Sequence, residues 1–290
     1  MSTRSVTAQI PALSLQEGAG VQVFRTLGTP ACRNLDPFLM LDRFESNDPD
    51  DYVAGFPDHP HRGFCTFTYM LDGRMRHRDS MGNEGLLGPG GAQWMKAASG
   101  VIHSEMPEQD HGLMRGFQLW INLPVAEKMG SPDYQEVRPE TVPEVDLDGG
   151  RVRVLIGPFH GPDGTVAEGP VVDAHTDTRY LDVTLTGGAG FRQAVPAGHN
   201  AMLFLFEGSG TVAGSTIAGD ELVLLGPGDE VAVEAGPDGA RFILVAGRPL
   251  NEPIVQYGPF VMDSQDAIHE AFNDFRQGRL VREKAAFHES

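Results

Sequence analysis

The sequence is poor in cysteine and contains no long hydrophobic run. Its two cysteines, Cys32 and Cys65, form no CxxC motif and no disulfide framework, which favours a reduced, cytoplasmic protein. No apolar stretch approaches the roughly 18 residues of a membrane-spanning helix, and residues 1–18 contain no apolar segment of signal-peptide length. We therefore expect a cytoplasmic protein that does not enter a membrane.

Basic residues are also scarce. The chain has 22 Lys and Arg against 40 Asp and Glu, which gives a formal net charge of −18. Proteins that hold nucleic acid or an anionic membrane surface carry basic patches, because phosphate groups are negative. The charge therefore argues against direct nucleic-acid binding and against a membrane partner. It is compatible with binding of a cation or a small molecule, and with solubility alone.

Glycine and proline are abundant, at 36 and 21 residues. Both residues mark turns, and between them lie short runs rich in β-branched and aromatic residues. These runs predict strands in the first half of the chain at residues 21–27, 36–44, 64–71, 75–79, 92–97, 103–106 and 117–123. A segment rich in proline, glycine and acidic residues follows at 131–175 and contains a further predicted strand at 152–156.

The pattern of the first half then returns. Strands are predicted at residues 179–186, 201–206, 221–225, 230–233 and 241–245. The turn signals repeat as well, because 28 residues separate His61 from Pro89 and His199 from Pro227. This repetition indicates two copies of one barrel. We expect an N-terminal barrel at residues 1–130, a linking segment at 131–175 and a C-terminal barrel with the chain end at 176–290.

The C-terminal segment differs from the rest of the chain. From 264 to 277 the apolar residues recur at helical spacing. Asp263 or Ser264 can cap the start of this segment, and Gly278 can end it. The sequence therefore predicts a C-terminal α-helix that packs on a barrel.

Two short segments carry the residues with metal-binding chemistry. His59 and His61 are two positions apart, and so are His103 and Glu105. Side chains at i and i+2 of a strand point to the same face, so each pair can converge. Two such strands facing each other across a barrel would place three imidazoles and one carboxylate around a single point. This donor set suits Fe, Cu, Ni, Zn or Mn and predicts a mononuclear metal site with room for substrate or oxygen.

Residues next to these pairs bear on the same site. Gly63 and Gly100 flank the two pairs and allow close approach of the backbone. Cys65 has the strand parity of the two histidines before it. A regular strand would therefore turn its thiol to the barrel interior, unless Gly63 introduces a bulge.

The remaining histidines receive other assignments. His77 lies on a predicted return strand and is a candidate for a supporting contact behind the ligands. His199 has no partner histidine in its half of the chain, which predicts that the second barrel holds no metal. The others are expected at the surface: His111, His160, His175, His269 and His288.

On these residues the chain resembles the pirin family of the cupin superfamily over nearly its whole length. The resemblance rests on six segments: DPFLMLDRF at 36–44, HPHRG at 59–63, QWM at 93–95, HSEMP at 103–107, LPVAEKM at 123–129 and YGPFVM at 257–262. It implies an all-β bicupin of two facing jelly-roll barrels with a C-terminal α-helix. It also implies one metal, in the N-terminal barrel alone, and the ligand set carried onto this sequence is His59, His61, His103 and Glu105.

The chain departs from ordinary cupins at one place. They have a glutamate a few residues after the HxH motif, where this chain has Phe64, Cys65 and Thr66. Glu105 takes that role, as in pirins. Many pirins carry an acidic residue near the position of Cys65, and its absence here leaves the polarity of the pocket floor open.

The resemblance implies two functions of different classes. One is quercetin 2,3-dioxygenase activity, the metal-dependent opening of the central ring of a flavonol by O2 with release of carbon monoxide. For it Fe(II) is the expected ion, with Ni, Cu, Mn, Co or Zn as alternatives, and Glu105 is the candidate general base. Aromatic residues are candidates to hold the flat substrate: Phe56, Phe64 and Trp94. For Trp94 we favour a place in the core instead. The other function is a regulatory protein-interaction module, as a transcriptional co-regulator or a modulator of a metabolic enzyme. A third alternative is a metal-binding scaffold whose flavonol activity is incidental.

Overall fold

The structure is a computed structural model that describes residues 2–161 and 164–290. The chain forms two compact units, and each is built from three separate segments. The site unit comprises Ser14–Gly28, Phe38–Pro139 and Leu250–Ser290 and contains His59, His61 and His103. The second unit comprises Met1–Leu13, Thr29–Pro37 and Glu140–Pro249.

The larger sheet of the site unit is antiparallel except where the last strand joins it. Its strand order is β2 (Leu13–Glu17), β3 (Val21–Leu27), β4 (Phe38–Ser46), β11 (Met114–Asn122), β6 (Phe64–Asp72), β9 (Ala92–Lys96), β12 (Asp133–Val137) and β25 (Ala286–Glu289). β12 and β25 pair in parallel. β4, β6 and β11 are almost fully buried, as their runs of aliphatic and aromatic residues require.

The smaller sheet of the site unit carries both predicted ligand pairs. Its strand order is β5 (Phe56–His61), β10 (Val101–Pro107), β7 (Met75–Asp79) and β8 (Glu84–Leu87). Because β10 pairs with both β5 and β7, its side chains lie between those of two neighbouring strands.

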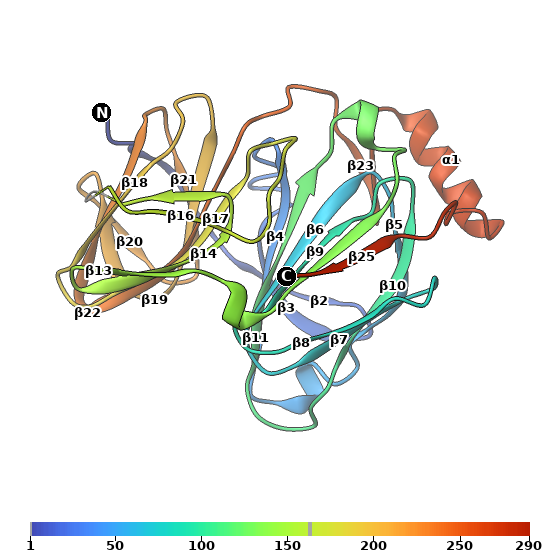
Figure 1. The fold of residues 1–290 in the computed structure, drawn as a ribbon, viewed down its shortest axis with the longest axis horizontal. Coiled ribbons are helices and arrows are strands. Elements are labelled where there is room, and N and C mark those ends of the chain that lie inside the picture. Colours follow the sequence, from blue (N-terminus) through green and yellow to red (C-terminus); the bar gives the residue numbers. More distant parts are fainter. Residues whose placement is uncertain (1, 162–163) are drawn as a thin grey trace. The chain divides into compact units, whose positions relative to one another are not determined.

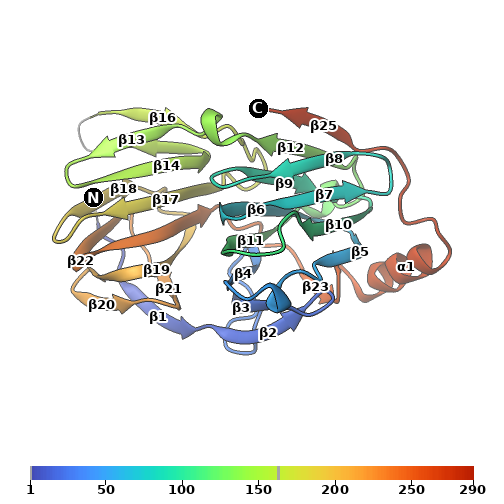
Figure 2. The same cartoon turned by 90° about the horizontal axis from the view of Figure 1, so that it is seen from below.

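A short hairpin and the C-terminal helix complete the site unit. The hairpin joins β23 (Val255–Tyr257) to β24 (Phe260–Met262), and α1 (Gln265–Arg276) follows it. Figures 1 and 2 both show α1 beside β23 and β5. Ser264 caps the helix, because its hydroxyl accepts a hydrogen bond from the amide of Ala267. Two 3₁₀ turns also belong to this unit, η1 (Pro49–Asp51) and η2 (Val125–Glu127), and η3 (Pro139–Thr141) begins at its edge.

The second unit has one large sheet wrapped around an apolar core. The strand order is β1 (Val6–Pro11), β21 (Glu221–Leu225), β19 (Asn200–Val212), β22 (Glu230–Gly247), β17 (Arg179–Leu185), β14 (Gly150–Ile156) and β13 (Glu144–Leu147). β18 (Gly190–Ala194) pairs with β22, and β20 (Ser215–Ala218) pairs with β19. β15 (Pro158–His160) and β16 (Val166–Glu168) form a separate hairpin. Leu181, Leu203 and Phe242 are among the residues that fill the core.

Most of the expected strands are present, and the predicted helix is confirmed. The strands at 21–27, 75–79 and 221–225 have the predicted bounds. The strands expected at 230–233 and 241–245 belong to the single strand β22. Among the described residues, no helix is long and apolar enough to cross a membrane.

The division into units differs from the expected bounds of 1–130, 131–175 and 176–290. Part of the supposed link is sheet, since β14 pairs with β17 of the second unit. The chain end returns to the site unit, where β25 pairs with β12 and α1 packs on the β23–β24 hairpin. These pairings join residues far apart in the chain, so a linear division of the sequence misses them.

Candidate metal centre

The register between β5 and β10 brings the predicted histidines together. His103 lies directly opposite His59, and a bulge follows between His103 and Glu105. The ring centroid of His59 is 4.7 Å from that of His61 and 4.4 Å from that of His103, and the centroids of His61 and His103 are 5.1 Å apart. The three histidines therefore converge. Contrary to the expectation from the sequence, the strands that carry them do not face each other across the barrel, because β5 and β10 are paired neighbours in one sheet.

The possible ligand atoms form two overlapping groups. The first group has one ring nitrogen from each of three histidines, and these nitrogens lie within 4.8 Å of one another: His59, His61 and His103. His77, His103 and Glu105 form a second such group. His103 is common to both, because β10 lies between β5 and β7. Glu105 therefore approaches the cluster from the side of His77, whose Nδ1 is 3.5 Å from its Oε1.

Hydrogen bonds determine which ring nitrogen of His59 and of His61 is available to bind a metal. The Nδ1 of His59 lies 2.9 Å from the carbonyl oxygen of Pro57, and the Nδ1 of His61 lies 3.4 Å from that of Pro259. A carbonyl only accepts, so each Nδ1 carries the hydrogen and each Nε2 keeps a lone pair. Metal-binding histidines are held in this way by a hydrogen bond from the other nitrogen.

Burial keeps His61 and His103 in the neutral form that binds a metal. Burial, with a contribution from His59, holds the pKa of His61 well below its usual range. Burial and the neighbouring histidines do the same to the pKa of His103. Both ring nitrogens of His103 are buried and have no hydrogen-bond partner among the described residues. Such a nitrogen is costly unless something binds it. A neutral, buried imidazole of this kind fits a metal ion, and the histidine cluster can bind one.

The two glycines that flank the ligand pairs have the role expected of them. Gly63 and Gly100 adopt φ values of +91° and +145°. A Cβ at Gly63 would meet the carbonyl oxygen of Val261, and one at Gly100 would meet that of Leu280. Only glycine allows this close approach, which packs both ligand strands against the C-terminal segment.

A row of polar side chains crosses the larger sheet opposite the histidines. Successive strands place Arg25 beside Asp42, Asp42 beside Gln118, Gln118 beside Thr68, and Thr68 beside Gln93. Directly opposed residues share one face of a sheet, so this row lies on a single face. Gln118 and Thr68 of this row donate hydrogen bonds to Glu105 on the smaller sheet.

Glu105 is the residue that this row contacts. Its carboxylate is buried and accepts hydrogen bonds from the Nε2 of Gln118, at 3.0 Å from each oxygen. The hydroxyl of Thr68 donates to its Oε1 over 3.4 Å. Gln118 and Thr68 were missed from the sequence, because only the register of β11 and β6 brings them to Glu105.

A cavity of about 580 Å³ opens onto the cluster, within the range of small-molecule sites. His59, His61 and Glu105 line it, with Gln118 and an apolar wall of Met40, Phe56 and Trp120. The cavity also has polar lining residues: Glu17, Arg25, Asp42 and Asp58. Arg25 forms a two-pronged hydrogen bond with Asp42, at 2.8 and 2.7 Å.

The expected aromatic residues take different places. Phe56 lines the cavity, whereas Phe64 is fully buried beneath it and packs on Trp120 with ring centroids 4.2 Å apart. Trp94 is on β9 and is not among the residues that line the cavity. Trp120, which does line the cavity, was not singled out from the sequence.

Cys65 does not face the barrel interior, although regular strand alternation from His59 and His61 had predicted that it would. Gly63 interrupts the strand between β5 and β6, so the alternation restarts at Phe64. Thr68 contacts Glu105, and Phe64 and Thr66 share its face by alternation. The buried Cys65 therefore faces the other way, where it contributes to the electrostatic environment of Lys128.

Comparison with known proteins identifies the fold and the family. A model of the family named Pirin matches residues 20–121, and a model of the Pirin C-terminal cupin domain matches residues 180–281. A pirin-like protein of Caulobacter vibrioides is 49% identical over 280 residues, which cover 97% of this chain and 100% of that protein. The chain belongs to the pirin family. It is thus an all-β bicupin with a C-terminal helix, as the sequence predicted.

Other pirin relatives carry the name of an enzyme. A protein of Pseudomonas aeruginosa named "Putative quercetin 2,3-dioxygenase" is 50% identical over 270 residues, covering 91% of this chain and 94% of that protein. The crystal structure of quercetin 2,3-dioxygenase from Acinetobacter baumannii matches with a TM-score of 0.87 and 32% identity, over 96% of this chain and 99% of that chain. A bacterial pirin from Escherichia coli, solved in complex with nickel(II), has the same fold with a TM-score of 0.66 and 19% identity, over 83% and 98% of the two chains.

Proposed function

We propose that this pirin is a metal-dependent dioxygenase that opens the central ring of flavonols such as quercetin with O2 and releases carbon monoxide. The observation that carries the proposal is the cluster of His59 with the buried His61 and His103, at a cavity that Glu105 also lines. The names of two similar proteins support the same reaction: "Putative quercetin 2,3-dioxygenase" of Pseudomonas aeruginosa and the quercetin 2,3-dioxygenase of Acinetobacter baumannii.

We assign one divalent transition metal per chain to His59, His61, His103 and Glu105. The three imidazoles are mutually close and Glu105 joins them through His103. Nitrogen and carboxylate donors suit Fe(II), the ion we expect, and also Ni, Cu, Mn, Co and Zn. A bound ion of this kind would act as a Lewis acid toward the 3-hydroxyl and 4-carbonyl oxygens of a flavonol.

The residues of the chain would bind and deprotonate the substrate. Phe56, Trp120 and Met40 offer apolar surface to a flat ring system. Glu105 faces the same cavity and would take the proton of the 3-hydroxyl as general base. The electron-rich anion would then react with O2, and both oxygen atoms would enter the product as one ring carbon leaves in carbon monoxide.

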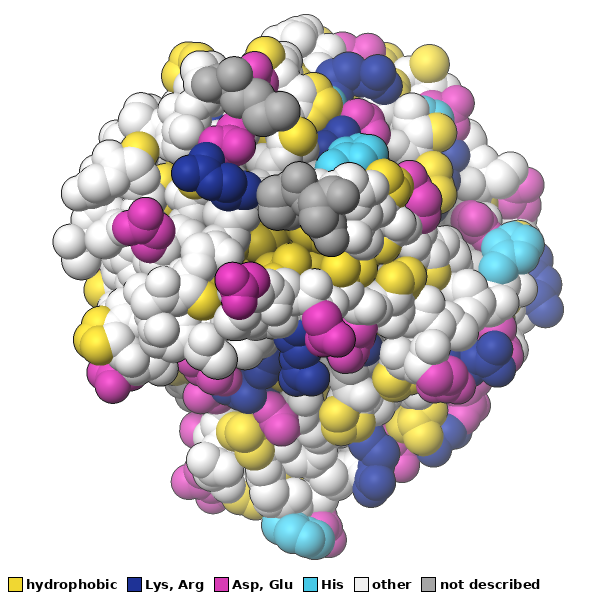
Figure 3. All heavy atoms as spheres, turned by 60° about the vertical axis from the view of Figure 1, so that its left-hand side comes forward, with side chains coloured by type: hydrophobic (Ala, Val, Ile, Leu, Met, Phe, Trp, Pro, Cys, Tyr) yellow, Lys and Arg dark blue, Asp and Glu magenta, His cyan; other side chains and the backbone are white. Residues whose placement is uncertain are grey.

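Other partners fit the structure less well. Acidic side chains are interspersed with basic ones on the face drawn in Figure 3, in a chain of net charge −18. This supports the expectation that the protein does not bind nucleic acid directly. Within residues 2–161 and 164–290, Cys32 and Cys65 form no disulfide, which is compatible with the cytoplasmic location that we propose.

The substitution Glu105→Gln tests the role of the carboxylate, because it keeps the shape and removes the base. With metal content matched between the two proteins, we expect turnover of quercetin in air to fall by roughly 10²–10⁴-fold. Equal turnover by wild type and Glu105→Gln would remove the base role. A metal-loaded wild type that does not consume quercetin would favour the alternative, a regulatory protein-interaction module.

A further inference from the structure

Gln118 and Glu105 both line the cavity, and their side chains are in contact. Gln118 is on β11 of the larger sheet, whereas Glu105 is on β10 of the smaller one. The Nε2 of Gln118 is 3.0 Å from both carboxylate oxygens and also donates to the hydroxyl of Thr68 over 3.3 Å. One amide group therefore contacts the whole carboxylate from across the barrel.

Donor and acceptor chemistry fixes the direction of this amide. The indole Nε1 of Trp120 only donates, and it does so to the Oε1 of Gln118 over 3.1 Å. The carboxylate of Glu105 only accepts. If the amide turned over, its oxygen would face the carboxylate oxygens and its NH2 group would face the indole N–H. The amide of Gln118 consequently has one favourable orientation, and Trp120 determines it.

Trp120 is itself held firmly. Its ring packs on Phe64, and its centroid is 5.2 Å from that of His61. It is two positions after Gln118 on the same strand, so both side chains are on one face. Both also line the cavity. A substrate that contacts the indole of Trp120 therefore contacts the group that orients Gln118.

We propose that Gln118 is a positioning residue for Glu105 and that the indole N–H of Trp120 sets its orientation. The contact holds the carboxylate at the cavity, beside His103. This inference rests on the proposed function, in which Glu105 is both a metal ligand and the base. Outer contacts to ligating groups are worth about 10–100-fold in metal affinity or activity.

Two substitutions remove single links of the chain from Trp120 to Glu105. Gln118→Met removes the amide at nearly constant length, and Trp120→Phe keeps an aromatic ring but removes the N–H. The double variant combines them. The sequence contains one other tryptophan, Trp94, which does not line the cavity, so Trp94→Phe is the matched control.

Metal affinity is measured first, by competition of each protein with a chelator for Ni(II) in the absence of substrate, after thermal unfolding has confirmed a folded variant. We expect Gln118→Met to lose about 10–100-fold in affinity and a similar factor in kcat with quercetin. Trp120→Phe should lower both quantities in the wild-type background and change neither by more than about twofold in the Gln118→Met background. Trp94→Phe should match the wild type.

Two results would overturn the proposal. One is a Gln118→Met protein with metal affinity and kcat within about twofold of the wild type. The other is an equal effect of Trp120→Phe in both backgrounds, which would mean that the indole does not act through Gln118. If the wild type binds metal but consumes no flavonol, the proposed reaction fails, whereas the affinities still decide whether Gln118 positions Glu105.

Discussion

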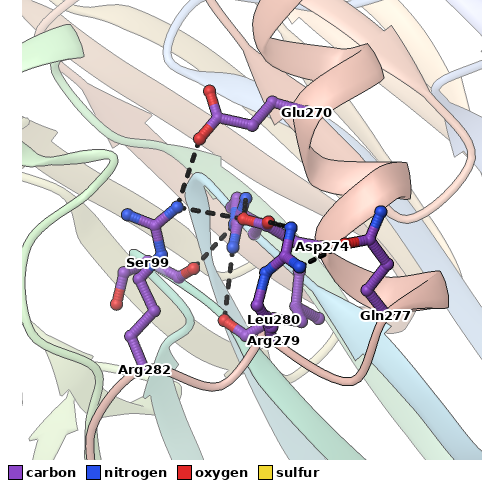
Figure 4. Close-up of polar contacts among 8 residues, drawn as sticks. Ser99, Glu270, Asp274, Gln277, Arg279, Leu280 and Arg282 are labelled. Atoms are coloured by element: carbon purple, nitrogen blue, oxygen red, sulfur yellow. Dashed lines mark hydrogen bonds and ion pairs between the residues drawn. The ribbon is translucent and has the colours of Figure 1, made fainter.

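Arg62 Nη1 donates a hydrogen bond to Asp274 Oδ2 over 3.0 Å and so joins the residue after His61 to helix α1. The same guanidinium, which is almost fully buried, also donates to the carbonyl oxygens of Ser99 and Leu280. Figure 4 shows Asp274 facing Arg279 and Arg282. The C-terminal segment is therefore bound, through Arg62, to the end of the strand that carries His61.

This contact predicts a large effect of Asp274→Ala on stability. Removing the carboxylate leaves Arg62 charged and buried, which costs about 3–5 kcal/mol. The free energy of unfolding in urea measures the loss. Glu270→Ala is the control, because its ion pair with Arg282 is solvent-exposed and should contribute less than about 0.5 kcal/mol. Equal stability of Asp274→Ala and wild type would show that α1 does not depend on this pair.

Metal content should depend on His103. It belongs to both groups of possible ligand atoms, so His103→Ala removes the residue that they share. We expect elemental analysis to find about one metal per chain in the wild type and almost none in this variant. His111→Ala, at an exposed loop, should keep the wild-type content. Full occupancy in His103→Ala would refute the ligand assignment.

Lys128 predicts a pH dependence of stability. Its buried ammonium donates to the carbonyl oxygens of Gly63 and Val261 and to Asn122. Burial lowers the pKa of Lys128 to about 8, against 10.5 for an ordinary lysine. Between these values the unfolded chain binds more protons than the folded one, so this group makes stability rise with pH.

Urea unfolding at pH 7.5 and pH 9.5 measures this effect. Lys128→Met should be less stable than wild type by about 3 kcal/mol at pH 7.5, because three oxygens lose their donor. The difference in stability between wild type and Lys128→Met should widen at pH 9.5. Only the wild type has the buried ammonium, and it gains stability when that group loses its proton. The exposed Lys284→Met should leave the pH response unchanged. A difference that narrows with pH would contradict this interpretation.

His199→Ala should leave metal binding and turnover unchanged. His199 is in the second unit, where its Nε2 lies 3.2 Å from the carboxylate of Asp177. We predict that the unit which contains it holds no metal. Elemental analysis and a quercetin assay of His199→Ala check this, with thermal unfolding to confirm the fold. Loss of metal from a folded variant would contradict it.

The sequence predicted the features that depend on local spacing. Strand alternation is a local rule, and the i and i+2 spacing led to the histidines that the structure brings together, His59, His61 and His103. The helical spacing of the apolar residues over 264–277, with Ser264 as a cap, likewise predicted α1. These features need no knowledge of which strands are neighbours.

The sequence could not predict what depends on register between distant strands. Gln118 and Thr68 meet Glu105 because β11 lies beside β6 and both face β10. Trp120 was missed for the same reason. The parity of Cys65 failed because Gly63 breaks the strand, an effect that spacing alone leaves open.

The stoichiometry of oxygen uptake and carbon monoxide release tests the central claim most directly. The metal-loaded wild type is mixed with quercetin in air, and O2 consumed, carbon monoxide formed and flavonol lost are measured together. The account predicts about one O2 consumed and one carbon monoxide released for each flavonol, with Glu105→Gln slower by roughly 10²–10⁴-fold at equal metal content. Loss of flavonol without carbon monoxide, or no loss with any of Fe(II), Ni, Cu, Mn, Co and Zn, would contradict it.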